Sequence, residues 1–290
     1  MQTVGASDFC EAMSCAAQYG HIEIVEMCKE WRAKDFGKAM YFVAQYRHIE
    51  VIKLCREWGA TNFRDVVRCA IKNEYIEIIK LCREWKVCDL NYAMEYAAEC
   101  ERIGIVKMYK EWGANDFQKT MCAATWDGHT DIVKLCREWG AVDYNEVWDC
   151  AARYGHIDII KLCREWGASN YGGAVQCAIK YKYIEIIKLC KEWEVCNPNF
   201  VMRYAAENGC IEIIKLCKEW GANNFDEAVC AAVKNGHLNV VELLHRDWEV
   251  CDRVSVIECA IKNNRTKIVN LCEKWDAHKK KSERSMCHLL

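Results

Sequence analysis

Proline is nearly missing from this chain, which has one among 290 residues. Because proline breaks helices and is at home in turns, its scarcity argues against long irregular loops and for nearly continuous helix. No apolar run approaches the roughly 18 residues that a membrane-spanning helix requires. The opening MQTVGASD has neither the charged nor the apolar region of a secretory signal. We therefore expect a cytoplasmic protein.

An excess of positive charge is missing too. Lys and Arg total 40 against 42 for Asp and Glu, a formal net charge of −2. Proteins that coat a phosphate backbone usually carry a basic excess or stripe, so we expect no nucleic-acid partner. The sequence also has no C-x-x-C and no pair of histidines at i, i+4 near a cysteine. Without these ligand patterns zinc is unsupported, and we expect no metal and no cofactor.

What the chain does contain is a repeated tryptophan. Its spacing is 27 residues throughout, except for one interval of 28, and a fixed period of this kind marks a repeat architecture. The tryptophans of this series are Trp31, Trp58, Trp85, Trp112, Trp139, Trp166, Trp193, Trp220, Trp248 and Trp275. The sequence predicts an array over residues 7–277 and a basic tail over 278–290. The expected units lie near 8–34, 35–61, 62–88, 89–115, 116–142, 143–169, 170–196, 197–223, 224–251 and 252–278.

Each unit is predicted to fold as two short helices. In the first unit, FCEAMSCAAQY and HIEIVEMCKEW both place apolar residues three and four apart, which is the spacing of one helix face. Glycine follows the tryptophan in five units, where a helix end often needs the left-handed conformation. A small residue, nearly always alanine, recurs in the middle of the first helix and indicates close helix packing. The ninth unit has one extra residue, so we expect a bulge or a longer connection in its second helix.

The 22 cysteines indicate buried thiols. Eight of them stand three residues before the repeated tryptophan, and equivalent positions of stacked helices lie about 8–10 Å apart. A disulfide needs Cα atoms closer than about 7 Å, so the series cannot be a ladder of bridges. We expect reduced thiols that act as small hydrophobic residues, and hence a reducing compartment.

Two other columns are expected to be structural. The repeated indoles should be buried, each covering the shortened loop of the next unit. Five histidines open second helices, and Tyr, Arg or Cys replaces them in other units, an exchange that a catalytic or metal role would not tolerate. The histidines are His21, His48, His129, His156 and His237, and the replacements are Tyr75, Arg102, Tyr183, Cys210 and Arg265.

The segments AAQYGHIEIVEMCKEW and AARYGHIDIIKLCREWGA resemble the ankyrin repeat, whose helical core reads A-A-x-x-G-H-x-E-I-V-x-x-L before a closing G-A. The resemblance covers all ten units, but the T-P-L-H turn is absent and the period is 27 rather than 33. It implies an all-α, ankyrin-like α-solenoid of ten stacked helix pairs with shortened or absent β-hairpins. Such Trp- and Cys-rich arrays are also similar to multigene-family repeat proteins of large cytoplasmic DNA viruses, such as African swine fever virus.

Such a solenoid implies a monomeric, non-catalytic scaffold that binds protein partners, possible host proteins among them, on its concave face. Positions that vary between similar units, near the middle and end of the first helix, are the candidates for that surface. Tyr, Trp and Arg are favoured among them because these residues most often dominate binding energy. The candidate binding residues are Tyr41, Tyr46, Arg68, Glu95, Trp126, Asp149, Arg153, Tyr154, Tyr181 and Arg203. The alternative is that these are tolerant solvent positions.

Two other functions remain open. The chain ends in Cys287-His288-Leu289-Leu290, which fits the C-x-x-Leu form of a geranylgeranylation box, with basic residues upstream. A prenyl chain at Cys287 beside a basic patch would make the protein a membrane-tethered adaptor. The remoter alternative is a thiol enzyme, but Cys–His pairs are available almost anywhere in this chain and none is singled out.

Overall fold

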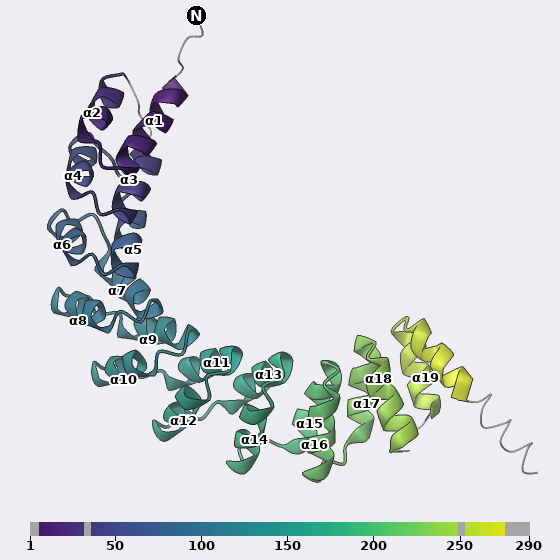
Figure 1. Ribbon diagram of the computed structural model, residues 1–290. Coiled ribbons are helices and arrows are strands. Elements are labelled where there is room, and N and C mark those ends of the chain that lie inside the picture. The colour runs from purple at the N-terminus through teal and green to yellow at the C-terminus, as the bar shows by residue number, and fades with distance from the viewer. Residues whose placement is uncertain (1–5, 32–35, 249–252, 276–290) are drawn as a thin grey trace, which may run out of the picture. The chain divides into compact units, whose positions relative to one another are not determined.

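The computed structural model describes residues 6–31, 36–248 and 253–275 (Figure 1). Every regular element within these ranges is a helix, and they contain no strand. The helices follow one another in pairs joined by short turns, so the predicted all-α class is confirmed.

The chain forms two compact bodies, Met1–Asp143 and Tyr144–Leu290. In each body we call the earlier member of a pair the first helix and the later one the second helix. The first helices of the first body are α1 (Ala6–Gln18), α3 (Phe36–Gln45), α5 (Arg64–Lys72), α7 (Leu90–Glu99) and α9 (Phe117–Trp126). Its second helices are α2 (Ile22–Glu30), α4 (Ile49–Glu57), α6 (Ile76–Glu84), α8 (Ile103–Glu111) and α10 (Thr130–Glu138).

The second body repeats the arrangement. Its first helices are α11 (Tyr144–Tyr154), α13 (Tyr171–Tyr181), α15 (Pro198–Glu207), α17 (Phe225–Asn235) and α19 (Arg253–Lys262). Its second helices are α12 (Ile157–Glu165), α14 (Ile184–Glu192), α16 (Ile211–Glu219), α18 (Leu238–Glu242) with the π-helix η1 (Leu243–Asp247), and a last helix over residues 266–275. The π-helix falls in the unit with the extra residue, so the predicted bulge is confirmed.

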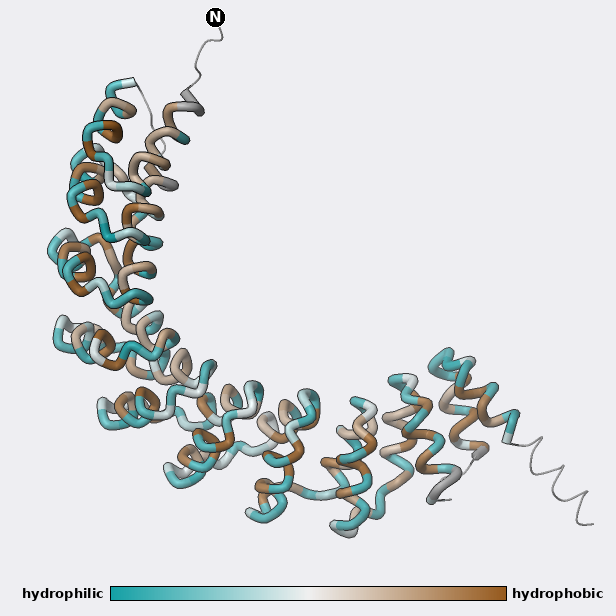
Figure 2. Tube along the Cα trace, in the orientation of Figure 1, coloured by the Kyte–Doolittle hydropathy of each residue, from teal (hydrophilic) through white to brown (hydrophobic). Residues whose placement is uncertain are grey.

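Within each body the first helices pack on one another and on their own second helices. Contacts between successive second helices are sparser. The recurring alanine explains the close approach, because it is buried in every unit that carries it, as Ala70 and Ala97 illustrate. In Figure 2 the hydrophobic stretches lie within the helices, while the turns between them are mostly hydrophilic.

The second helices end as the sequence predicts. Gly59, Gly113, Gly140, Gly167 and Gly221, each directly after the repeated tryptophan, all have positive φ, between 86° and 105°. Glycine adopts this conformation without steric cost. Lys86 and Glu194 take the same place in two units and also have positive φ, 54° and 57°.

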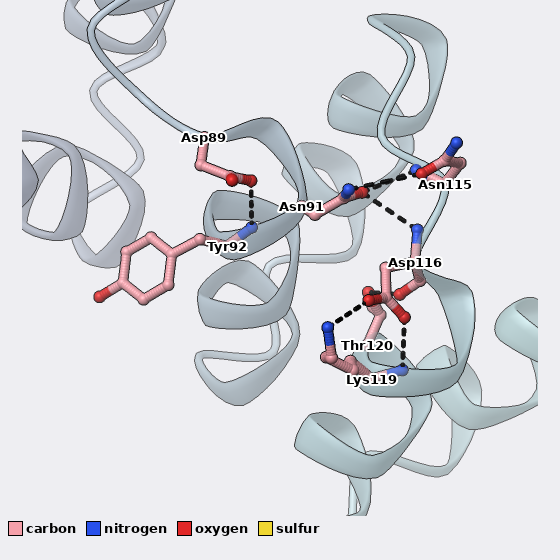
Figure 3. Close-up of polar contacts among 7 residues, drawn as sticks. All are labelled: Asp89, Asn91, Tyr92, Asn115, Asp116, Lys119 and Thr120. Carbon is pink, nitrogen blue, oxygen red and sulfur yellow. Dashed lines mark hydrogen bonds and ion pairs between the residues drawn. The ribbon is translucent and has the colours of Figure 1, made fainter.

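A side-chain amide holds the loop that follows several of these turns (Figure 3). The Oδ1 of Asn91, in the first turn of α7, accepts hydrogen bonds from the backbone N–H groups of Asn115 at 2.8 Å and Asp116 at 3.0 Å. These two residues lead into α9, which Asp116 then caps by accepting from the backbone N–H of Lys119. Loop N–H groups with no strand partner are thus satisfied by the preceding unit.

The same contact recurs in the second body. Asn145 accepts from the N–H groups of residues 169 and 170, both at 2.9 Å. Asn199 accepts from those of residues 223 and 224 at 2.8 and 2.9 Å. We call this arrangement the asparagine–loop contact. In these three units it fixes the connecting loop against the preceding first helix.

Candidate binding face

The repeated indoles occupy the second-helix side of each body, and they are half-buried rather than buried. Nine of the ten are half-buried, and Trp31 is 50% exposed. The prediction that each is buried over the loop of the next unit is therefore wrong. The indole instead lies against the aromatic residue that begins the first helix of its own unit. Ring centroids are 5.4–6.0 Å apart in the pairs Phe9–Trp31, Phe36–Trp58, Phe63–Trp85, Phe117–Trp139, Tyr144–Trp166 and Phe225–Trp248.

A cation from the preceding unit lies over the ring of six of these indoles. Cation–centroid distances are 4.1–4.5 Å in the pairs Lys29–Trp58, Arg56–Trp85, Arg83–Trp112, Lys110–Trp139, Arg164–Trp193 and Lys218–Trp248. These are cation–π distances. The cations lie in the last turn of the second helices. They are engaged in holding successive units together.

We call the residue immediately before each second helix the corner residue, and at six junctions it links neighbouring units. Its side chain donates to a backbone carbonyl near the end of the preceding first helix, 30 or 31 residues earlier, at 2.8–3.3 Å. The pairs, each written with the donor first and the residue of the accepting carbonyl second, are His48–Gln18, Tyr75–Gln45, Arg102–Lys72, His129–Glu99, His237–Glu207 and Arg265–Lys234. Histidine, tyrosine and arginine can exchange here because all three donate, and His48, His129 and His237 thus have a structural contact.

The cysteine column is buried, as predicted. Cys28, Cys55, Cys82, Cys136, Cys163, Cys190, Cys217 and Cys272 are all at most 1% exposed and are free thiols. Burial raises the pKa of Cys55 to about 11 and that of Cys82 to about 12. Wherever the environment of a described thiol shifts its pKa, burial raises it. A raised pKa disfavours the thiolate that a nucleophilic cysteine needs.

The first helices carry the exposed aromatic side chains that the sequence proposes for binding. Tyr41, Tyr46, Trp126, Tyr154 and Tyr181 are each 45–49% exposed. An indole or phenol with this much free surface is unusual in a helix whose other face is packed, and Tyr and Trp often anchor interfaces. Three of these rings also lie beside their corner residue, for example Tyr46 with His48 at 6.5 Å.

The structure brings two of the predicted residues, Tyr41 and Arg68, together in a groove of about 400 Å³ across α3, α5 and α7. We call it the α3–α5–α7 groove. Arg68 lies 4.7 Å from the ring centroid of Tyr96, which forms part of the far wall. The lining residues are Tyr41, Gln45, Asp65, Arg68, Cys69, Lys72, Asn73 and Tyr96. The groove thus combines two phenols, two cations and one carboxylate.

Sequence reasoning missed Tyr96 as a member of this groove. Tyr96 follows Glu95, which is in the varying column, but it contacts the column residue of the unit before it. Only the register between adjacent first helices reveals that pairing. The signal available in the sequence is the 28-residue separation of Arg68 and Tyr96, one more than the period.

The remaining predicted residues differ in their exposure to solvent. Glu95, Asp149 and Arg203 are half-buried, while Arg153 is exposed. Burial raises the pKa of the Glu95 carboxyl, and the ammonium of Lys119 opposes that shift. Arg203 lies 4.3 Å from the ring centroid of Tyr204 on its own helix. Asp149, Arg153, Tyr154, Tyr181 and Arg203 belong to the second body, and the other five predicted residues belong to the first.

Cys287 lies outside the described residues. Among the helices that the structure describes, none combines the length and apolar character needed to cross a bilayer. In the same residues, no three His, Cys, Asp or Glu side chains gather in a way that could hold a metal ion.

Comparison with known proteins adds no identification: no protein-family model matches the sequence, and neither does any curated protein.

Proposed function

We propose that this protein is a non-catalytic scaffold that binds another protein on its first-helix face. In this proposal the units form an ankyrin-like α-solenoid with shortened hairpins, and the closely packed first helices line its concave side. The α3–α5–α7 groove carries the proposal, because it is where exposed Tyr41 and Arg68 meet a concave surface.

The side chains of the two faces differ in what they contact, and this difference supports the proposal. On the second-helix side, cations such as Arg56 and Arg83 cover indoles and so hold units together. On the first-helix side, the varying positions differ widely in chemistry and several remain exposed. Variation without a shared structural role is expected of a surface adapted to a partner.

The groove indicates which partner segment it would accept. Arg68 and Lys72 are exposed and outnumber the single carboxylate of Asp65. The two tyrosines offer flat apolar faces beside these charges. We propose a partner segment with an acidic side chain next to an aromatic or aliphatic one. The abundance of buried, reduced thiols supports a reducing compartment such as the cytoplasm. If the viral resemblance holds, the partner is a host-cell protein.

Quantitative affinity purification tests the proposal. The full chain is compared with Tyr41→Ala and Arg68→Ala, and with the matched control Lys80→Ala, which changes an exposed residue of α6 on the second-helix side. Truncating a binding hot spot costs about 2 kcal/mol or more, so each groove variant should weaken the purified complex by roughly 30-fold. The control should leave the affinity unchanged. Loss of the partner in the Lys80 variant, with retention in both groove variants, would refute the proposal.

A further inference from the structure

One corner residue is too short for its position. At six other junctions His, Tyr or Arg spans the gap to a carbonyl of the preceding first helix, but the residue before α16 is Cys210. Its thiol donates to the carbonyl oxygens of Ile179 at 3.5 Å and Asn208 at 3.6 Å. The counterpart of the usual acceptor is the carbonyl of Lys180, 30 residues before Cys210.

A pocket of about 290 Å³ lies at this junction. Lys182 and Ile184 line it from the preceding unit, and residues 209–213 line it from the unit of Cys210. The isoleucines at 184, 211 and 213 give it apolar walls. An apolar protein cavity of about 150 Å³ holds benzene, so this pocket has room for a substituted ring.

At three other junctions the residue 28 positions before the corner residue is charged and contacts it, whereas glycine stands there before His48, His156, Tyr183 and His237. Glu74 pairs with Arg102 at 2.8 Å, and Glu101 lies 3.8 Å from the His129 ring nitrogen. Where this position is a cation, the corner residue is a phenol: Arg47 lies 5.7 Å from the ring centroid of Tyr75. The Tyr75 hydroxyl donates to the Gln45 carbonyl at 3.3 Å.

Lys182 holds this position before Cys210. Its φ of 63° matches those of Arg47, Glu74 and Glu101, which lie between 57° and 61°. The junction therefore has a cation where Arg47 stands beside Tyr75, but it lacks the phenol. Lys182 disfavours a guanidinium guest, and the carboxylate of Glu212 at the pocket wall disfavours an anionic one. A neutral ring with a hydroxyl donor satisfies both conditions.

We propose that the pocket at Cys210 is a binding site for a phenol, either a tyrosine side chain of another molecule or a free small phenol. The ring lies against the isoleucines and Lys182, as Tyr75 lies against Arg47. The hydroxyl donates to a backbone carbonyl at the end of α13, as the Tyr75 hydroxyl donates to the carbonyl of Gln45. This site lies in the second body and is separate from the α3–α5–α7 groove.

The test is NMR titration of the full chain with p-cresol, and with toluene as the probe that lacks the hydroxyl. p-Cresol should shift the backbone signals of Lys182, Ile184 and residues 209–213. Loss of one neutral hydrogen bond corresponds to about a two- to tenfold weakening for toluene. Cys210→Tyr supplies the missing phenol from the chain itself and should abolish p-cresol binding. Lys182→Gln removes the cation and should weaken binding about two- to fivefold.

A matched gain-of-site control is Tyr75→Cys, which should create a second p-cresol site beside Arg47 in the first body. If wild type shows no shifts at these residues, or binds toluene as tightly as p-cresol, the proposal is wrong. It is also wrong if Cys210→Tyr folds and binds p-cresol as wild type does. If that variant does not fold, the toluene and Lys182→Gln comparisons decide.

N-acetyl-tyrosine amide distinguishes the sources of the phenol. Its binding assigns the pocket to a tyrosine side chain, and binding of p-cresol alone assigns it to a free phenol. Because these probes require no protein partner, their outcome is independent of the groove experiment.

Discussion

The asparagine–loop contact predicts that Asn91→Ala destabilises the first body through its loop and not through its core. The substitution removes the acceptor for two backbone N–H groups, those of Asn115 and Asp116. A typical hydrogen bond contributes about 0.5–1.5 kcal/mol net. Asn115 is exposed and water can replace its lost partner, whereas Asp116 is half-buried. We therefore expect Asn91→Ala to lower the free energy of unfolding by about 1–2 kcal/mol, which is the lower half of the range of about 1–3 kcal/mol for two such bonds.

Asn91→Asp isolates the acceptor role. The carboxylate oxygen can still accept from both N–H groups, although the 3.4 Å contact from Asn91 Nδ2 to the Asn115 side chain is lost. Repulsion from Asp116 is moderated because Lys119 pairs with that carboxylate at 2.6 Å. Asn91→Asp should thus be more stable than Asn91→Ala at neutral pH. Asn62→Ala is the control, since the Asn62 amide contacts only the Asp65 side chain, at 3.4 Å.

Two measurements check this prediction. Urea unfolding gives the total change in free energy, and amide hydrogen exchange reports the residues concerned. The amides of Asn115 and Asp116 should exchange faster in Asn91→Ala and at nearly the wild-type rate in Asn91→Asp. Unchanged exchange at both amides in Asn91→Ala, or equal effects of the two substitutions, would refute the reasoning.

Three further predictions concern the packing between units. Arg83→Ala should lower the free energy of unfolding in urea by about 0.5–1 kcal/mol, because the cation lies 4.5 Å from the Trp112 centroid at an exposed site. Arg83→Lys keeps the positive charge and should retain most of this stabilisation. Equal losses in the two variants would contradict the prediction. Ala97→Leu should cost about 1–3 kcal/mol by overpacking a fully buried helix contact, and an unchanged unfolding midpoint would count against the close approach. Burial raises the pKa of Cys82 and Cys136 from 9.0 to about 12, so the folded state favours the thiol. The contribution of the two neutral thiols to the free energy of unfolding is complete below pH 9. Above pH 9 it falls by about 1.4 kcal/mol per pH unit for each thiol. Between pH 9 and 11 the free energy of unfolding of the Cys82→Ala/Cys136→Ala variant should decline less steeply than that of the wild type. Identical slopes would contradict the raised thiol pKa values.

The sequence predicts the helix pairs, the glycine turns and the buried thiols because these depend on contacts within a unit or on burial alone. A 27-residue period with apolar residues three and four apart leaves little freedom for the local fold. The extra residue of the ninth unit likewise appears where expected, as the π-helix Leu243–Asp247. In each case the physical cause lies within a few residues of the pattern.

Contacts between units are harder to predict. The pairing of Asn91 with residues 115 and 116, or of Arg83 with Trp112, depends on the register between neighbouring units. Periodicity gives the number of units but not that register. The incorrect prediction of fully buried indoles has the same origin, because the cation that contacts Trp58, Trp85, Trp139 or Trp248 comes from the neighbouring unit. For the binding face, the sequence predicts Tyr41 and Arg68 but not the Tyr96 wall.

The corner residues show how variation in a repeat protein can be divided between structure and binding. At that column His48, Tyr75 and Arg102 differ in shape and charge but share one action, donation to the preceding unit. Variation that preserves a common interaction is structural. Tyr41 and Arg68 stand in a column whose members differ in chemistry, and both are exposed, which is why we propose that column as the binding surface. Cys210 is shorter than the other members of its column and lines a pocket at its junction, and a structural position thereby becomes a candidate for binding.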